Sequence, residues 1–184
     1  DVFGRAALGR LLDVLTLHVL SVLHMLDLRV DGLERHVVVN EIIEPLMNYN
    51  KDVDFDINIS PDYVIFSDRV RLKIALNNLI SNAVKYGFKE KNTAYKVSVS
   101  AENGDGKYKI VVSDEGKGIP PEQLKKVFEI FFSEAAATSV ESSGLGLYLV
   151  RQAIDKIDGN VTVRSKVDVG TEFEINLPDL ASNN

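Results

Sequence analysis

Residues Asn78–Tyr86 read NLISNAVKY, and their spacing places three polar side chains on one face of an expected helix. Asn78 and Asn82 are four residues apart, and Lys85 continues the same face at the next turn. Carboxamide oxygens are neutral hard ligands that suit a Mg²⁺ ion whose charge is balanced mainly by phosphates. Lys85 offers those phosphates a point charge. Taken alone, the stretch also fits a helix whose amides are simply solvated.

A second motif, DEGKGIP, occupies residues 114–120 and follows an apolar strand pattern. A carboxylate at Asp114 can accept a hydrogen bond from an amino group on a flat base. Gly116 and Gly118 allow the backbone to approach a ligand closely. An ordinary Asp-Gly turn explains this motif equally well when it is considered by itself.

A third motif, GLGL, occupies residues 144–147 and precedes an amphipathic pattern. Gly144 and Gly146 open an expected helix, whose first N–H groups lack backbone partners and favour phosphate. The pattern is neither the Gly-Lys-Ser/Thr phosphate loop nor a dinucleotide fingerprint after a first strand. Three motifs in this order and at these distances together predict a nucleotide site.

Hydrophobic periodicity predicts helices and strands in irregular alternation. We expect five helices: at 5–30, from a cap at Asn40, from a cap at Ser67 or Asp68 to Gly87, from Pro121 to about Phe128, and from 147 to Gly159. We expect strands at 53–59, 64–66, 97–101 and 108–112, and a final hairpin of 161–163 with 173–177. Residues 133–143 are expected to form a loop. This arrangement favours an α+β fold, a two-layer sandwich of a mixed sheet with helices on one face.

The composition narrows the class of protein. The 184 residues carry a net charge of −6, which argues against a nucleic-acid partner because such proteins need a basic face. The absence of cysteine excludes disulfides and fits a reducing cytoplasm. The longest uncharged apolar stretch, near Val14–Leu26, is too short to span a bilayer, so we expect no direct membrane contact. The chain begins with Asp1 rather than Met, so we expect a fragment of a longer protein. A membrane anchor elsewhere in that parent protein is compatible with this sequence.

Taken together, residues 36–178 resemble the ATP-binding catalytic domain of bacterial sensor histidine kinases. This domain has the Bergerat fold that gyrase, mismatch-repair ATPases and an ATP-driven heat-shock chaperone share. Five stretches carry the resemblance. They are the N box at 78–86, the G1 box at 114–120, a stretch similar to the F box at 127–132, the core of the G2 box at 144–147, and a closing glycine box at 170–173.

The resemblance implies the ligands and the roles of the site residues. ATP and Mg²⁺ are the implied cofactors, with Asn78 and Asn82 as metal ligands and Lys85 near the phosphates. Asn78 and Lys85 are the implied catalytic residues. Asp114 is the implied adenine contact, with Thr171 beside it. The remaining implied nucleotide contacts are Tyr86, Gly116, Gly118, Ile119, Gly144, Leu145, Gly146 and Leu147.

One position distinguishes kinases from hydrolases in this superfamily. Hydrolysing members resemble one another in placing a Glu, the general base for water, where this chain has Asn78. A carboxamide cannot take that proton. Asn78 therefore favours a histidine kinase, which holds ATP for another nucleophile, over a stand-alone ATPase.

The chain departs from the family pattern at three points. Glu115 stands where the G1 box usually has Asn, and Ser142 replaces the first glycine of the fuller G2 box. The expected lid segment, residues 133–143, contains no Lys or Arg and so lacks a phosphate contact common in the family. The change at Glu115 should be tolerable, because neighbouring groups carry most of the contacts. Ser142, the lid without a basic residue and the missing phosphoacceptor support an alternative, a pseudokinase or scaffold that signals by docking without phosphotransfer.

The phosphoacceptor box of the family is not recognisable around His18, His24 or His36, because no acidic residue directly follows any of them. We therefore divide the chain into a remnant of a dimerisation helix without that box (1–35), the catalytic domain (36–178) and a tail (179–184). The expected partners are a dimerisation domain that carries the phosphoacceptor histidine, a response regulator, and a second copy of the chain bound through the N-terminal helix.

Overall fold

The computed structural model describes residues 36–49, 53–60, 63–87, 95–104, 106–132 and 144–179. Contacts divide the chain into two units, Asp1–Gly32 and Leu33–Asn184, and all described residues belong to the second. The predicted helix at 5–30, the lid segment at 133–143 and the histidines His18 and His24 lie outside the described residues. His36 is described and begins a short strand.

A five-stranded mixed sheet forms the first layer of the fold. Its strand order is β2-β4-β5-β7-β6, and only the β2–β4 pair is parallel. The strands are β2 (Asp54–Asn58), β4 (Lys96–Gly104), β5 (Lys107–Asp114), β6 (Asn160–Lys166) and β7 (Gly170–Pro178). A separate antiparallel pair joins β1 (His36–Val38) to β3 (Val64–Phe66).

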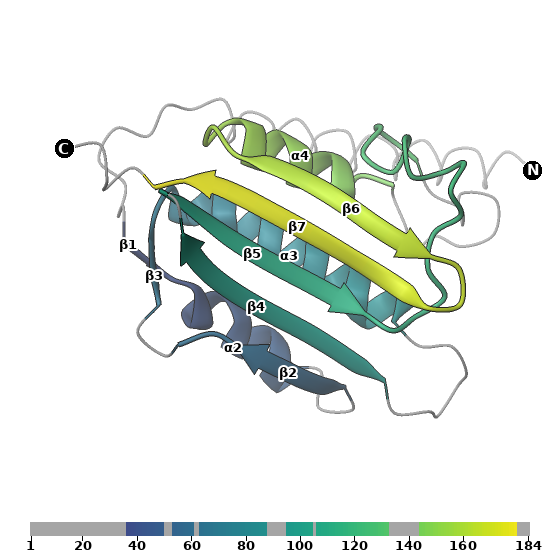
Figure 1. Cartoon of the computed structure of the whole chain (residues 1–184), viewed down its shortest axis with the longest axis horizontal. Helices are drawn as coiled ribbons and strands as arrows, with labels where there is room; N and C mark the ends of the chain where they lie inside the picture. Colours follow the sequence, from purple (N-terminus) through teal and green to yellow (C-terminus); the bar gives the residue numbers. More distant parts are fainter. Residues whose placement is uncertain are drawn as a thin grey trace, which may run out of the picture. The chain divides into compact units, whose positions relative to one another are not determined.

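Three helices form the second layer: α2 (Val39–Tyr49), α3 (Arg69–Tyr86) and α4 (Gly146–Asp155). All three lie behind the sheet in Figure 1, and the opposite face of the sheet carries no described helix. The core lies between the layers because each strand alternates inward apolar and outward polar residues. Fully buried side chains include Leu76, Ile80, Ile110, Ile154 and Ile175. The predicted α+β two-layer sandwich is confirmed.

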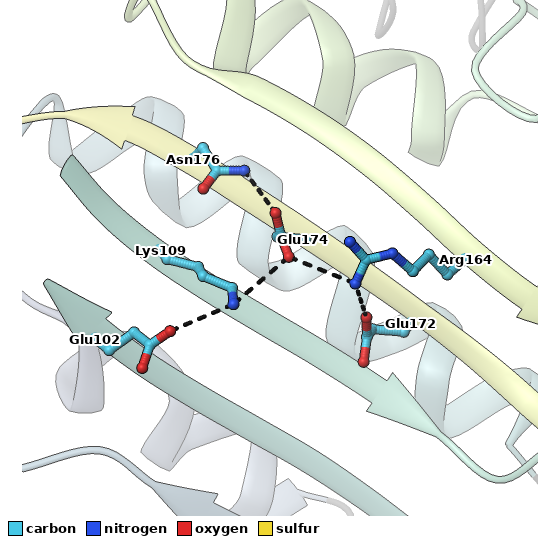
Figure 2. Close-up of polar contacts among 6 residues, drawn as sticks. All are labelled: Glu102, Lys109, Arg164, Glu172, Glu174 and Asn176. Atoms are coloured by element: carbon cyan, nitrogen blue, oxygen red, sulfur yellow. Dashed lines mark hydrogen bonds and ion pairs between the residues drawn. The ribbon is translucent and has the colours of Figure 1, made fainter. Parts of the chain in front are cut away.

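The open face of the sheet is covered by charged and polar side chains. Figure 2 shows six of them, on β4, β5, β6 and β7: Glu102, Lys109, Arg164, Glu172, Glu174 and Asn176. Glu174 lies 3.7 Å from Lys109 Nζ and 3.9 Å from Arg164 Nη1. The hydrogen bond from Asn176 lowers the pKa of Glu174, and the two cations add to this effect. Since exposed ion pairs contribute about 0–1 kcal/mol, this face keeps the sheet solvated without dominating its stability.

Two local predictions were wrong. Residues 121–128 do not form an α-helix; they form successive turns in which Gln123 N–H donates to the Pro120 carbonyl and Lys126 N–H to the Gln123 carbonyl. Val127 is the only fully buried side chain of residues 121–128, so although Leu124, Val127 and Phe128 have helical spacing, little burial on the core stabilises a helix here. Asn40 lies inside the first turn of α2 rather than capping it, and its amide donates to the Ser60 carbonyl.

No helix in the described parts of the chain has both the length and the apolar character needed to cross a bilayer.

Candidate nucleotide-binding site

Helix α3 buries one face in the core, so Asn78 and Asn82 lie on a face that is only partly covered. The helix begins at an N-cap, Asp68, whose side chain accepts a hydrogen bond from Arg71 N and forms an ion pair with the Arg71 guanidinium. Leu72, Leu76 and Leu79 are fully buried. Asn78 and Asn82 are only partly buried and occupy the neighbouring face. The predicted cap at Asp68 and the predicted end at Gly87 are confirmed.

The two carboxamides meet at the first residue of α4. Asn78 Nδ2 donates to the Ile74 carbonyl at 2.8 Å, which fixes the amide so that Oδ1 faces away from that carbonyl. A Cβ atom on Gly146 would lie 2.9 Å from Asn78 Oδ1 and 4.0 Å from Asn82 Nδ2. Since Gly146 begins α4, two carboxamides and the N-terminus of a helix come together here. We call this place the phosphate end of the site.

Asp114 ends β5 beside the C-terminus of α3. Its Oδ1 accepts a hydrogen bond from Gly116 N at 2.9 Å. A Cβ atom on Gly116 would lie 2.1 Å from the Tyr86 carbonyl oxygen, so only glycine lets this turn lie directly on the helix. Burial raises the pKa of Asp114, and hydrogen bonds from the backbone of Gly116 and Thr171 oppose that rise. We call the surroundings of Asp114 the base end of the site.

Thr171 pairs directly with Asp114 across β5 and β7 and is only 8% exposed. Gly170 precedes it with φ +143°, a conformation open to glycine, and a Cβ there would lie 2.0 Å from the Asp114 carbonyl oxygen. Ser165, on β6, faces Thr171 from the other side and contacts its hydroxyl at 3.0 Å. Asp114, Thr171 and Ser165 thus form a row across three neighbouring strands.

Three cationic or aromatic side chains gather at the C-terminal end of α3, around the ring of Tyr86. The ammonium of Lys85 lies 5.5 Å from the ring centroid of Tyr86, and that of Lys117 lies 5.4 Å from it. Such distances permit cation–π attraction. Lys85 and Tyr86 are predicted site residues, whereas Lys117 is not. Its position between Gly116 and Gly118 is the signal in the sequence that could have suggested it.

The predicted residues of the G2 box divide between the site and the packing around it. Leu145 is buried, and Leu147 packs against the core. A Cβ atom on Gly144 would lie 2.6 Å from the backbone carbon of Phe131, so only glycine lets these two backbone segments lie directly against each other. Phe128, nearby in sequence, stacks edge-on against Phe173 and lies under the Arg151 guanidinium.

Sequence reasoning missed Ser165. Besides its contact with Thr171, this hydroxyl accepts a hydrogen bond from Ile119 N at 2.8 Å and donates one to the Gly170 carbonyl at 2.8 Å. It therefore ties the predicted residue Ile119 to the closing glycine box. The strand pattern contains a signal, because Val161, Val163 and Ser165 share the inward face, and a hydroxyl on that face, half-buried here, needs hydrogen-bond partners.

The described residues contain no group of three or more His, Asp or Glu side chains gathered to hold a metal ion. A Mg²⁺ ion at the phosphate end would therefore depend on neutral amide oxygens and on the phosphates themselves. Such a donor set fits Mg²⁺, which keeps few protein ligands and shares its charge with substrate phosphates.

Residues 67–181 match the family described as histidine kinase-, DNA gyrase B-, and HSP90-like ATPases. The chain belongs to this family. A relative in Vibrio parahaemolyticus, the autoinducer 2 sensor kinase/phosphatase LuxQ, is 38% identical over 136 residues, which is 70% of this chain and 16% of the relative. Because this chain belongs to a family of ATPase domains, the family assignment implies that it binds ATP.

Solved structures of histidine kinases agree with the family assignment. A mycobacterial sensor histidine kinase, MprB, superposes with a TM-score of 0.64 at 29% identity, over 77% of this chain and 91% of that one. Full-length ShkA, solved in complex with AMPPNP, gives a TM-score of 0.66 at 25% identity, over 88% of this chain and 36% of that one. The chain spans only 16–28% of the curated relatives that it matches.

Proposed function

We propose that the chain binds Mg·ATP and passes the γ-phosphoryl group to a histidine on a dimerisation domain outside the chain. The histidine nitrogen would bond to the γ-phosphorus while the bond to the β,γ-bridging oxygen breaks. ADP leaves, and the proton of the nitrogen goes to solvent. The protein's part in such a transfer is positioning and charge neutralisation.

The observation that carries this proposal is the orientation of the Asn78 carboxamide at the phosphate end. Its amide donates to the Ile74 carbonyl, and its oxygen is directed toward Gly146. An oxygen held in this way can bind a hard cation, but a carboxamide cannot accept a proton from water. The site therefore favours holding ATP for an external nucleophile over hydrolysing it.

Each predicted residue has a place in this scheme. Asn78 and Asn82 would hold Mg²⁺, Lys85 would neutralise phosphate charge, and the N-terminus of α4 at Gly146 would face the phosphates. Asp114 and Thr171 would contact the adenine. The remaining predicted contacts are backbone and packing residues between these two ends: Tyr86, Gly116, Gly118, Ile119, Gly144, Leu145 and Leu147.

The proposal extends to the parent protein and its partners. Residues 36–178 would be the catalytic domain, residues 1–35 a remnant of a dimerisation helix, and residues 179–184 a tail. The helix would join two copies of the chain, the phosphoacceptor histidine would come from a separate domain, and a response regulator would receive the phosphate. We place this activity in the cytoplasm.

Calorimetric titration with ADP and with a non-hydrolysable ATP analogue, each with and without Mg²⁺, tests the binding step. We expect micromolar affinity that depends on Mg²⁺. Incubation with ATP and a supplied dimerisation domain then tests phosphotransfer, with labelled phosphate on histidine as the expected product. Absence of binding at millimolar ligand would overturn the proposal.

A scaffold that signals by docking is the second candidate, because residues 133–143 contain no Lys or Arg and Ser142 replaces a glycine. Nucleotide binding does not separate the two candidates, since a pseudokinase can retain its nucleotide. Phosphorylation of a supplied dimerisation domain does separate them. A stand-alone ATPase would instead release phosphate without any acceptor domain.

A further inference from the structure

Ser165 makes three hydrogen bonds that join three segments at the base end. Its Oγ lies 2.8 Å from Ile119 N, 2.8 Å from the Gly170 carbonyl oxygen and 3.0 Å from Thr171 Oγ1. Ile119 belongs to the G1 turn, whereas Gly170 and Thr171 begin β7. One hydroxyl therefore fixes the G1 turn relative to the strand that carries Thr171.

The direction of each hydrogen bond follows from the atoms available. A serine hydroxyl has one hydrogen and two lone pairs. The Gly170 carbonyl can only accept, so it takes the Ser165 hydrogen, and the Ile119 N–H occupies one of the two lone pairs. The remaining lone pair faces Thr171 Oγ1. The Thr171 hydroxyl must therefore be the donor in its contact with Ser165.

This direction determines what Thr171 shows to a ligand. Its only hydroxyl hydrogen is directed toward Ser165, so its Oγ1 presents lone pairs elsewhere. Asp114, paired with Thr171 across the strands, is a hydrogen-bond acceptor in its ionised form. The side chains of both residues at the base end are then acceptors, an arrangement that matches an amino group and opposes a carbonyl oxygen.

We propose that Ser165 is a positioning residue that directs the Thr171 hydroxyl hydrogen away from the base and thereby makes the site prefer a 6-aminopurine over a 6-oxopurine. The inference rests on the proposed binding of ATP at this site. It adds a residue that touches no ligand itself and acts through Thr171.

The test compares ADP with inosine diphosphate, which has the same phosphates and sugar and a 6-oxo group on the base. Calorimetry in Mg²⁺ gives the ratio of the two affinities for the unaltered chain, for Ser165→Ala and for Ser165→Thr. We expect the unaltered chain to prefer ADP. In Ser165→Ala the Thr171 hydroxyl is free to donate to the 6-oxo group, so the preference falls about fivefold, as for one net hydrogen bond. Ser165→Thr keeps the hydroxyl and the preference.

A matched control is Ser113→Ala. Ser113 lies next to Asp114 in β5 but on the open face of the sheet, opposite Glu172. The same chemical change there should leave both affinities unchanged. A purely structural role for Ser165 would weaken ADP and inosine diphosphate equally, and an unchanged ratio in Ser165→Ala would overturn the inference while leaving ATP binding intact.

Two other outcomes are decisive. If the unaltered chain binds neither nucleotide, the proposed function fails and this inference fails with it. If Ser165→Ala does not fold, Thr171→Val removes the oriented hydroxyl and leaves the Ser165 bonds to Ile119 and Gly170 in place. The preference for ADP should then narrow by a similar factor, and an unaltered preference in Thr171→Val would contradict the inference.

Discussion

At the base end of the candidate site, Ser165 joins three segments through hydrogen bonds within the protein, whereas at the phosphate end Asn78 directs its oxygen toward Gly146. The base end is thus organised by folding itself. The phosphate end brings together two carboxamides and a helix N-terminus, to which we assign a cation and phosphates as partners. Substitutions at the base end should therefore change the stability of the chain without ligand, and substitutions at the phosphate end should weaken Mg²⁺-dependent binding without lowering that stability.

Gly170→Ala should have the largest effect, because it breaks the base end. A methyl group at φ +143° is strained, and it would lie 2.0 Å from the Asp114 carbonyl oxygen. We expect the free energy of unfolding without nucleotide to fall by about 3 kcal/mol or more, measured by urea denaturation. Gly104→Ala is the matched control, since a Cβ atom there meets nothing within 4 Å. Equal stability of Gly170→Ala and Gly104→Ala would contradict the claim that folding itself organises the base end.

Asn82→Ala tests the phosphate end. Losing one ligand of a charged centre typically costs about 1.5–3 kcal/mol, or roughly 10- to 150-fold in affinity. We expect that loss for ADP in Mg²⁺, almost none in EDTA, and no change in the melting temperature. Asn77→Ala makes the same change on the same helix but outside the face shared by Asn78 and Asn82. A lower melting temperature for Asn82→Ala alone would show that this end, too, is organised by folding.

Asp114→Asn sharpens the comparison, because we expect it to weaken ADP binding without lowering the stability of the fold. Burial raises the pKa of the Asp114 carboxyl, so the folded chain holds this proton more tightly than the unfolded chain. The ionised form therefore destabilises the fold at neutral pH, and the amide should leave stability unchanged or slightly higher. Affinity for ADP should fall about tenfold, because an acceptor for the amino group is replaced.

The pH dependence of Asp114 adds a second readout. Protonation removes the acceptor, so ADP affinity should fall with pH as the pH drops through a pKa above the ordinary value of 3.8. The phosphates titrate as well, and the same titration of Asp114→Asn measures their contribution. If ADP affinity depends on pH in the same way in the unaltered chain and in Asp114→Asn, Asp114 takes no part in binding the base.

Gly146→Ala should have the smallest effect. Its Cβ atom would lie 2.9 Å from Asn78 Oδ1, so the amide must shift by a few tenths of an ångström. We expect ADP affinity in Mg²⁺ to fall about threefold, since a partly lost hydrogen bond or ligand contact costs under about 1 kcal/mol. The fold itself should become slightly more stable, because alanine favours a helix over glycine by up to about 1 kcal/mol. A loss of stability in thermal melts would contradict this expectation.

The two ends also differ in how far the sequence predicts them. Asn78 and Asn82 lie on one helix, so their spacing alone places them together. The row of Asp114, Thr171 and Ser165 depends on the register of three strands, and register is set by tertiary packing and by turns. The glycine turn after an apolar strand pointed to Asp114 and the family resemblance added Thr171, but neither pointed to Ser165.

The wrong prediction at residues 121–128 has a related cause. Pro121 suits the first turn of a helix, but it also restricts Pro120 to an extended backbone. Only Val127 among these residues is buried and Phe128 is half-buried, and so little burial does not hold a short helix on a core. Strand β1, which pairs with β3, was not predicted because three residues carry too little periodicity.

The backbone of Gly144 lies directly against that of Phe131, which adopts φ +62°. In the terms of polymer physics, the described fold is left and entered again at nearly one point, so the sequence between, residues 133–143, has only a loop-closure condition to satisfy. The cost of closing such a loop grows only with the logarithm of its length, by about 0.6 kcal/mol for each doubling. Insertions and deletions in this segment are therefore inexpensive for the fold, and its length is open to evolutionary change while the two ends of the site stay where they are.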